Sequence, residues 1–130
     1  MSEPKIVIGA GAAGLTAAAV CAERGGRVLL IEKMERPGRK LRITGKGRCN
    51  VTNATFDLQG LLEHIPTNPR FLYSAFSNFM PYDTIALLED LGVSTKIERG
   101  ERVFPVSDNA TDIVDALVRR ALQKLHTGIF

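Results

Sequence analysis

The sequence predicts an α/β fold that begins as a Rossmann-like FAD/NAD(P)-binding domain with a parallel βαβ unit. Three observations carry this prediction. Lys5–Ile8 is a β-branched run, a glycine-rich turn follows it, and a second apolar run from Arg27 to Ile31 ends at the acidic residue Glu32. Between the two runs, Ala12–Glu23 is rich in alanine, as expected of the connecting helix.

The turn carries the glycine spacing of a dinucleotide-binding fingerprint. Gly9 permits a tight turn out of the first strand, and Gly11 has no Cβ to hold the backbone away from a pyrophosphate. Gly14 lets the following helix pack closely on the sheet. The unpaired N–H groups and the positive dipole end at the start of the helix then face the phosphates.

The acidic residue Glu32 follows Gly14 by 18 positions, a spacing typical of the carboxylate that accepts hydrogen bonds from an adenosine ribose. An acid at this position disfavours the 2′-phosphate of NADP. The alternative is a plain βαβ unit in which the glycines serve packing and Glu32 is a solvated strand end.

Composition indicates a globular chain with ordinary contents of apolar residues, 45%, and charged residues, 24%. The sequence contains no apolar stretch of the roughly 20 residues that a bilayer span needs. Residues 1–4 lack the basic start of a secretory signal and lead directly into the first strand, so we expect a cytoplasmic protein. The two cysteines indicate neither a disulfide framework nor a metal site.

Positive charge is concentrated in residues 33–48. This segment carries seven cations and one anion, whereas the whole chain has a net charge of only +3. A nucleic-acid surface and a merely solvated loop are two alternatives. The interspersed glycines and the lack of aromatic residues for base stacking favour a loop folded over a bound dinucleotide instead. The cations are Lys33, Arg36, Arg39, Lys40, Arg42, Lys46 and Arg48.

Two stretches of the sequence resemble a known family. Residues 37–53, PGRKLRITGKGRCNVTN, and residues 98–108, ERGERVFPVSD, are similar to signatures of the HI0933-like (YhiN-type) flavoproteins. The resemblance implies an FAD-dependent oxidoreductase that transfers hydride between the flavin and a small organic substrate, with NAD(P)H as a candidate electron donor. It selects no substrate and names no catalytic residue.

The resemblance also implies which residues contact FAD. The glycine-rich turn would hold the pyrophosphate, Glu32 the ribose and Lys33 the adenine region, while the later loop would lie along the cofactor toward the isoalloxazine ring. Asn50, Thr52 and Asn53 offer neutral groups suited to a flavin edge. The candidate cofactor-binding residues are Gly9, Gly11, Ala12, Ala13, Gly14, Glu32, Lys33, Arg39, Lys40, Gly45, Gly47, Arg48, Cys49 and Asn50.

The roles of two residues of this loop, Cys49 and Arg42, are not decided by the sequence. Cations beside Cys49 would favour its thiolate and allow a redox or nucleophilic role, whereas a small residue packed beneath the flavin is the favoured interpretation. Arg42 occupies a position that we expect to be more often apolar in the family.

The middle of the chain is predicted to form helices that carry no catalytic or binding residues. Asn68 is expected to cap a helix that packs its apolar face, Phe71–Phe79, in the core. A second helix is expected over Asp83–Leu91, ended by Gly92. Val93–Glu98 and Arg102–Val106 then predict a hairpin, a candidate substrate-side element. His64 and His126 lack partners at metal-ligand or triad spacing and are left out of the candidate site.

An apolar stripe between Ile113 and Leu125 predicts a crossover helix near the end of the chain. A doubly wound sheet needs a further parallel strand after it, and only residues 127–130 remain. We therefore expect residues 1–130 to be the amino-terminal part of an FAD-binding domain, with the carboxy-terminal half and the substrate domain absent. A non-catalytic, truncated nucleotide-binding remnant is the alternative to a complete flavoenzyme site.

Overall fold

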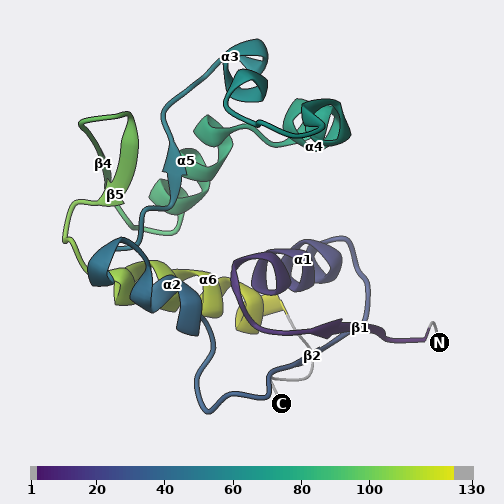
Figure 1. Cartoon of the computed structure of the whole chain (residues 1–130). Helices are drawn as coiled ribbons and strands as arrows, with labels where there is room; N and C mark the ends of the chain where they lie inside the picture. Colours follow the sequence, from purple (N-terminus) through teal and green to yellow (C-terminus); the bar gives the residue numbers. More distant parts are fainter. Residues whose placement is uncertain (1–2, 125–130) are drawn as a thin grey trace.

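The computed structural model describes residues 3–124 and contains one parallel and one antiparallel sheet, with helices packed against each of them (Figure 1). In this view the lower part of the molecule holds the parallel strands and the helices at residues 12–23, 39–43 and 110–124, and the upper part holds the antiparallel hairpin and the helices between residues 58 and 90. The elements are β1 Lys5–Ile8, α1 Ala12–Glu23, β2 Val28–Ile31, α2 Arg39–Ile43, the 3-10 turn η1 Thr44–Gly47, β3 Thr52–Asn53, α3 Leu58–Glu63, the 3-10 turn η2 Pro69–Leu72, α4 Tyr73–Asn78, α5 Pro81–Asp90, β4 Thr95–Glu98, β5 Arg102–Pro105 and α6 Ala110–Lys124.

The predicted βαβ unit is present. Strands β1 and β2 pair in parallel, with Lys5 opposite Val28 and Ile8 opposite Ile31. Helix α1 connects them, as the alanine-rich run predicted, and packs on one face of the pair. The Rossmann-like α/β class predicted from the sequence is therefore confirmed.

Helix α6 completes the core of the lower part by packing against α1 and α2. Its inward stripe is fully buried at Ile113, Val114 and Ala121. On the surface, the Arg120 guanidinium donates to both carboxylate oxygens of Glu23 at 2.9 Å, which ties α6 to the last residue of α1. The predicted helix is present through Lys124, but Leu122 of its apolar stripe is 46% exposed. Leu125 and the residues that follow it lie outside the described part of the chain.

The predicted hairpin is also present, and a third strand that the sequence did not predict extends it to a three-stranded sheet. β4 and β5 pair antiparallel, and the short β3 pairs with the other edge of β5, so the order is β3-β5-β4. Helix α5 packs on this sheet. Gly92 ends α5 as predicted: its φ is +85°, and the N–H of Val93 donates to the carbonyl of Leu88 at 2.9 Å.

A helical segment begins at Pro69 directly after Asn68, as predicted, but the prediction of one continuous helix that packs in the core through residue 79 was wrong. Asn68 has φ +49° and makes no side-chain cap, and a 3-10 turn precedes the short α4, so the spacing of one continuous helix does not apply. As a result Phe71 is 79% exposed and Phe79 is 44% exposed instead of lying in the core. Helix α5 also begins two residues before the predicted Asp83, because Pro81 suits the first helical position.

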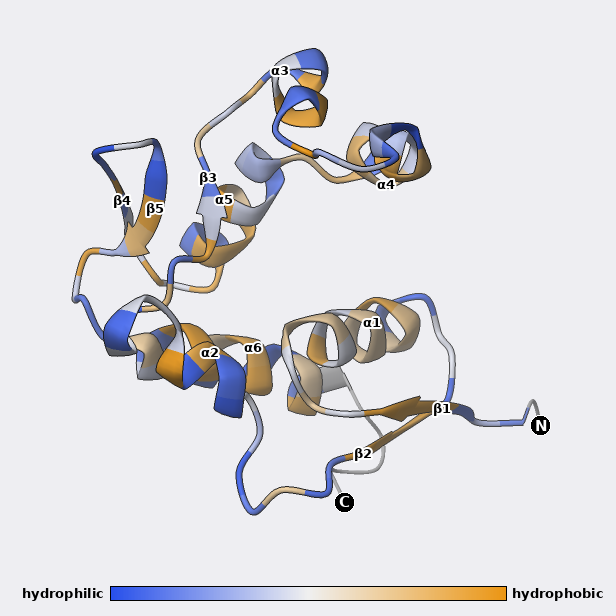
Figure 2. Cartoon of the chain, in the orientation of Figure 1, coloured by the Kyte–Doolittle hydropathy of each residue, from blue (hydrophilic) through white to orange (hydrophobic). Residues whose placement is uncertain are grey.

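One face of the parallel pair is not covered within the described part of the chain. Val28 and Leu30 point toward α1 and are buried, whereas Ile6, Ile8 and Ile31 point the other way and are exposed. Figure 2 shows the resulting hydrophobic colouring along both strands. Within residues 3–124, no helix is long and apolar enough to cross a membrane.

This difference between the two faces can be measured with a pair of truncations. Leu30→Ala should lower the free energy of unfolding by about 2–5 kcal/mol, because it leaves a cavity between the sheet and α1. Ile8→Ala removes a side chain that is 84% exposed and should change the free energy by less than about 0.5 kcal/mol. Urea denaturation of both variants checks the prediction, and equal losses would contradict this assignment of the faces.

Candidate dinucleotide-binding site

The glycine-rich turn has the geometry that its sequence predicted. Gly9 has φ +96°, a conformation that other residues rarely adopt. A Cβ on Gly14 would lie 1.8 Å from the carbonyl oxygen of Gly9, so this glycine is required for α1 to sit against the turn. A Cβ on Gly11 would meet nothing within 4 Å. The turn therefore leaves open space at Gly11 and none at Gly14.

Open space at Gly11 lies at the start of α1. Gly11 is the N-cap residue, no side chain caps the helix, and its first turn contains no acid. Ala12 and Ala13 are exposed. The first N–H groups of α1, with the positive end of its dipole, thus face outward without a carboxylate from the helix itself, which suits an anionic group.

Glu32 stands directly beside this turn. Its Oε2 accepts the N–H of Ala10 at 2.7 Å, and its Oε1 accepts the N–H of Met34 at 2.8 Å. These two bonds, with Met34 first, hold the pKa of the Glu32 carboxyl below its usual value. An ionised carboxylate has about four acceptor positions, so Glu32 keeps acceptor capacity for external donors such as ribose hydroxyls.

The backbone of Ala10 joins three segments, a role that the sequence did not predict. Its N–H donates to Glu32, and its carbonyl accepts the N–H of Gly38 at 2.8 Å. Gly38 has φ +70° and lies against Val114 of α6, where a Cβ would be 2.6 Å from the valine Cγ1. The only sequence signal for Ala10 is its place between two glycines of the fingerprint.

Residues 39–48 are not a simple loop as expected, because they contain α2 and η1. Gly45, Lys46 and Gly47 all have positive φ, of +57°, +57° and +84°. A Cβ on Gly45 would lie 3.0 Å from the Phe104 ring, so the absence of a side chain here leaves room for the hairpin. A Cβ on Gly47 would have only the carbonyl of Arg42 within 4 Å. Lys33, Arg39 and Lys40 are exposed on the surface.

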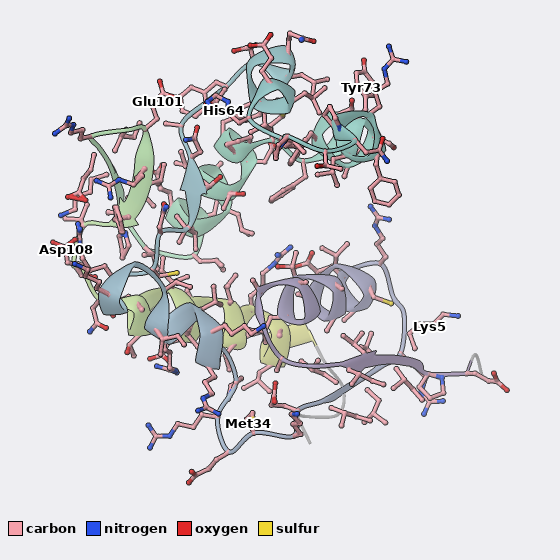
Figure 3. All side chains as sticks on the ribbon, viewed as in Figure 1. Lys5, Met34, His64, Tyr73, Glu101 and Asp108 are labelled. Carbon is pink, nitrogen blue, oxygen red and sulfur yellow. The ribbon has the colours of Figure 1, made fainter. Side chains whose placement is uncertain are left out.

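Arg48 is bound within the protein. Its Nε donates to Asp108 at 2.9 Å and its Nη2 to Glu98 at 2.8 Å, and the guanidinium lies 4.0 Å from the centre of the Phe104 ring. Lys96 also donates to Asp108 at 2.8 Å. Lys96 first, and then Arg48, hold the pKa of Asp108 below its usual value. Figure 3 shows Asp108 beside the hairpin, far from Met34 in the loop after β2.

Arg42, whose role the sequence left open, links α2 to α6. It donates to the Thr111 hydroxyl at 3.2 Å and pairs with Asp115 at 3.4 Å. Asn50, oriented with its amide nitrogen toward the sheet, donates to the carbonyls of Thr52 and Val103. These predicted cofactor-loop residues therefore hold the loop to the rest of the chain.

Cys49 lies fully buried in the core cluster. Burial raises the pKa of its thiol, and a hydrogen bond with Thr44 only partly opposes this change. The expectation that neighbouring cations favour its thiolate was wrong, because Arg48 turns toward the acids and Cys49 is removed from solvent. Its burial agrees with a small packed residue, whereas a place beneath the flavin stays a prediction.

A substitution at Glu32 tests its link to the turn. Glu32→Gln replaces a charged acceptor and should lower the melting temperature at pH 7. The lowered folded-state pKa means that the stabilisation is present above the ordinary value of 4.5 and is lost as the pH falls through the folded-state pKa. Thermal melts at pH 7 and pH 3 should show the difference shrinking. The exposed neighbour provides the control: Glu35→Gln should have little effect at either pH.

A second substitution tests the Arg48 cluster. Arg48→Met keeps much of the aliphatic stem but removes the bonds to Asp108 and Glu98, so it should lower the melting temperature. The effect should diminish in 1 M salt, where the screening length falls to about 3 Å. Arg99→Met, at the exposed hairpin turn, is the matched control. A decrease that is equal in both variants would show that the cluster does not stabilise the fold.

Comparisons with known proteins give the following matches. The model of the HI0933-like protein Rossmann domain matches residues 3–128. The chain is 40% identical over 113 residues to a ribosomal RNA dihydrouridine synthase of Escherichia coli K12, covering 87% of this chain and 27% of that protein. It is 34% identical over 128 residues to a 3-dehydro-bile acid delta(4,6)-reductase of Clostridium scindens, covering 95% of this chain and 30% of that protein.

The chain thus spans less than a third of the length of these curated relatives. Among solved structures, the crystal structure of Thermovibrio ammonificans THI4 is similar, with a TM-score of 0.61 over 96% of this chain and 36% of the other. Its sequence identity is 14%, so this likeness supports the fold alone.

Proposed function

The chain belongs to the HI0933-like protein family, and from this premise we propose that it holds FAD as part of a flavin-dependent reductase. The family and its oxidoreductase relatives give the general class, a flavoprotein oxidoreductase. The placement of FAD and the kind of bond reduced are the parts that we propose.

The observation that carries the proposal is the contrast between Gly11 and Gly14. Of these two glycines, Gly14 is required by the protein's own packing, whereas Gly11 is not. The space at Gly11 lies beside the uncapped start of α1. The FAD pyrophosphate fits there, because backbone N–H groups and the helix dipole stabilise its charge. The free acceptor positions of Glu32 then suit the ribose hydroxyls of the adenosine.

Residues of the α2 side have a supporting role in this proposal. Gly47 offers open backbone, and Arg39 and Lys40 offer exposed positive charge along the cofactor. Arg48, Cys49 and Asn50 would act by holding the loop in place, since their side chains are engaged within the protein.

The names of the relatives indicate which type of reaction to propose for the whole protein. Dihydrouridine formation and delta(4,6) reduction both describe addition of two hydrogens across a carbon–carbon double bond. In the uracil ring and in a 3-oxo bile acid, that bond is conjugated with a carbonyl. Bound flavin in its reduced form would supply the hydride, a proton would complete the addition, and NAD(P)H is the proposed source of the electrons that reduce the flavin. We propose reduction of such a conjugated double bond as the reaction of the whole protein.

Two glycine substitutions test the placement of FAD. Gly11→Val should leave the melting temperature nearly unchanged, because Gly11 has an ordinary φ of −86° and open space. It should weaken FAD binding at least tenfold, or about 1.4 kcal/mol, by blocking the pyrophosphate. Gly14→Ala should instead lower the melting temperature, because the new Cβ meets the Gly9 carbonyl. Flavin fluorescence titrations and thermal melts measure the two effects, and full FAD affinity in Gly11→Val would refute the placement.

A further inference from the structure

The proposed placement of FAD gives no role to the β4–β5 hairpin. Strand β5 lies within the second family signature, residues 98–108, and its contacts lead to the first signature, residues 37–53. It pairs with β3, and the N–H of Val51 donates to the carbonyl of Val103 at 2.9 Å. The two signatures therefore form one packed unit, although about 50 positions separate them in the chain.

Phe104 of β5 is the side chain at the centre of this unit, and it is only 3% exposed. Its Cε1 atom lies 3.0 Å from the point where a Cβ on Gly45 would stand. The guanidinium of Arg48 lies over its ring, 4.0 Å from the centre, where the ring attracts a cation. Phe104 thus packs against two residues of the first signature that are three positions apart.

The backbone between these two residues has an unusual conformation. Gly45–Gly47 all have positive φ, and Lys46 adopts it although residues with a side chain rarely do. We call these three residues the left-handed turn. The N–H of Cys49 closes it by donating to the carbonyl of Thr44 at 3.0 Å. Because the residues of the turn are exposed, its support has to come from the side that faces the hairpin.

The guanidinium over the Phe104 ring is held from the same side. Arg48 donates to Asp108 at 2.9 Å and to Glu98 at 2.8 Å. Glu98 ends β4 and Asp108 follows β5, so acids from both ends of the hairpin region bind the cation that lies on the ring. The left-handed turn is therefore supported by a buried ring and, through Arg48, by two carboxylates.

We propose that Phe104 is a positioning residue for FAD, which acts by holding the left-handed turn in the conformation that meets the cofactor. The inference deepens the proposed function and rests on it, because Gly47 is a residue that we place along FAD. Phe104 is buried and acts through the turn. A turn that is ordered before binding avoids the entropic cost of ordering it, so losing this support weakens the affinity for FAD.

Hydrogen exchange and FAD titration of one variant test this inference. Phe104→Leu keeps an apolar side chain but removes the ring. In the chain without FAD, the amides of Cys49 and Arg48, which close the turn, should exchange about tenfold faster or more, while core amides of α1 keep their rates. The affinity for FAD, measured by flavin fluorescence, should fall by about tenfold. The matched control Phe71→Leu, at a position that is 79% exposed, should change neither quantity.

A second variant tests the same support without altering the core. Asp108→Asn removes the charge that binds Arg48, and asparagine tolerates the positive φ of this position, +56°. It should speed exchange at Cys49 and weaken FAD binding, though less than Phe104→Leu does. In 1 M salt, which screens the ion pairs, the wild type should approach this variant. The control Asp90→Asn, at an exposed position of α5, should behave as the wild type.

The two readouts separate this inference from the proposed function. Unchanged exchange at Cys49 and Arg48 in both variants would overturn the inference, as would faster exchange with full affinity for FAD; either result leaves the proposed function intact. Exchange that is accelerated equally in α1 would also overturn it, since Phe104 would then serve only global stability. No uptake of FAD by the wild type would refute the proposed function and the role for FAD together, and the exchange rates would still decide whether Phe104 holds the turn.

Discussion

The lower part of the fold depends on two hydrogen bonds made by the backbone of Ala10. Its N–H is held by Glu32 at the end of β2, and its carbonyl is held by Gly38 at the start of α2. These two bonds fix the glycine-rich turn relative to both segments that follow the sheet. Because backbone groups that are buried must be paired, this arrangement satisfies the turn internally and leaves the first N–H groups of α1 for a ligand.

Internal packing and ligand binding make different demands on neighbouring residues of this site. Gly14 and Gly38 are required by α1, the turn and α6, whereas Gly11 and Gly47 have open space. Glu32 contributes to both, because it accepts two backbone N–H groups within the protein and keeps further acceptor positions for a ligand. A glycine pattern therefore marks a dinucleotide fingerprint without showing which glycine serves the protein and which serves the ligand. Only the surrounding atoms make that distinction.

The sequence predicted elements whose signals are local. The βαβ unit, the end of α5 at Gly92 and the hairpin all follow from residues adjacent in the chain. The exposed Phe71 could not be predicted, because one left-handed residue at Asn68 interrupts the helical spacing. The partners of Arg48 were equally inaccessible: Asp108 lies 60 positions away, so a run of cations showed its charge but not which members are neutralised. The placement of FAD stays a prediction.

The pairing of Glu23 with Arg120 has a consequence for how the chain folds during synthesis. Helix α1 emerges from the ribosome early, but α6 covers its buried face, and the paired residues Glu23 and Arg120 lie 97 positions apart. Contacts at such a sequence separation form slowly, because a long loop must be closed first. The apolar side of α1 therefore stays exposed in the nascent chain until α6 has been synthesised, and during this interval a chaperone would shield it.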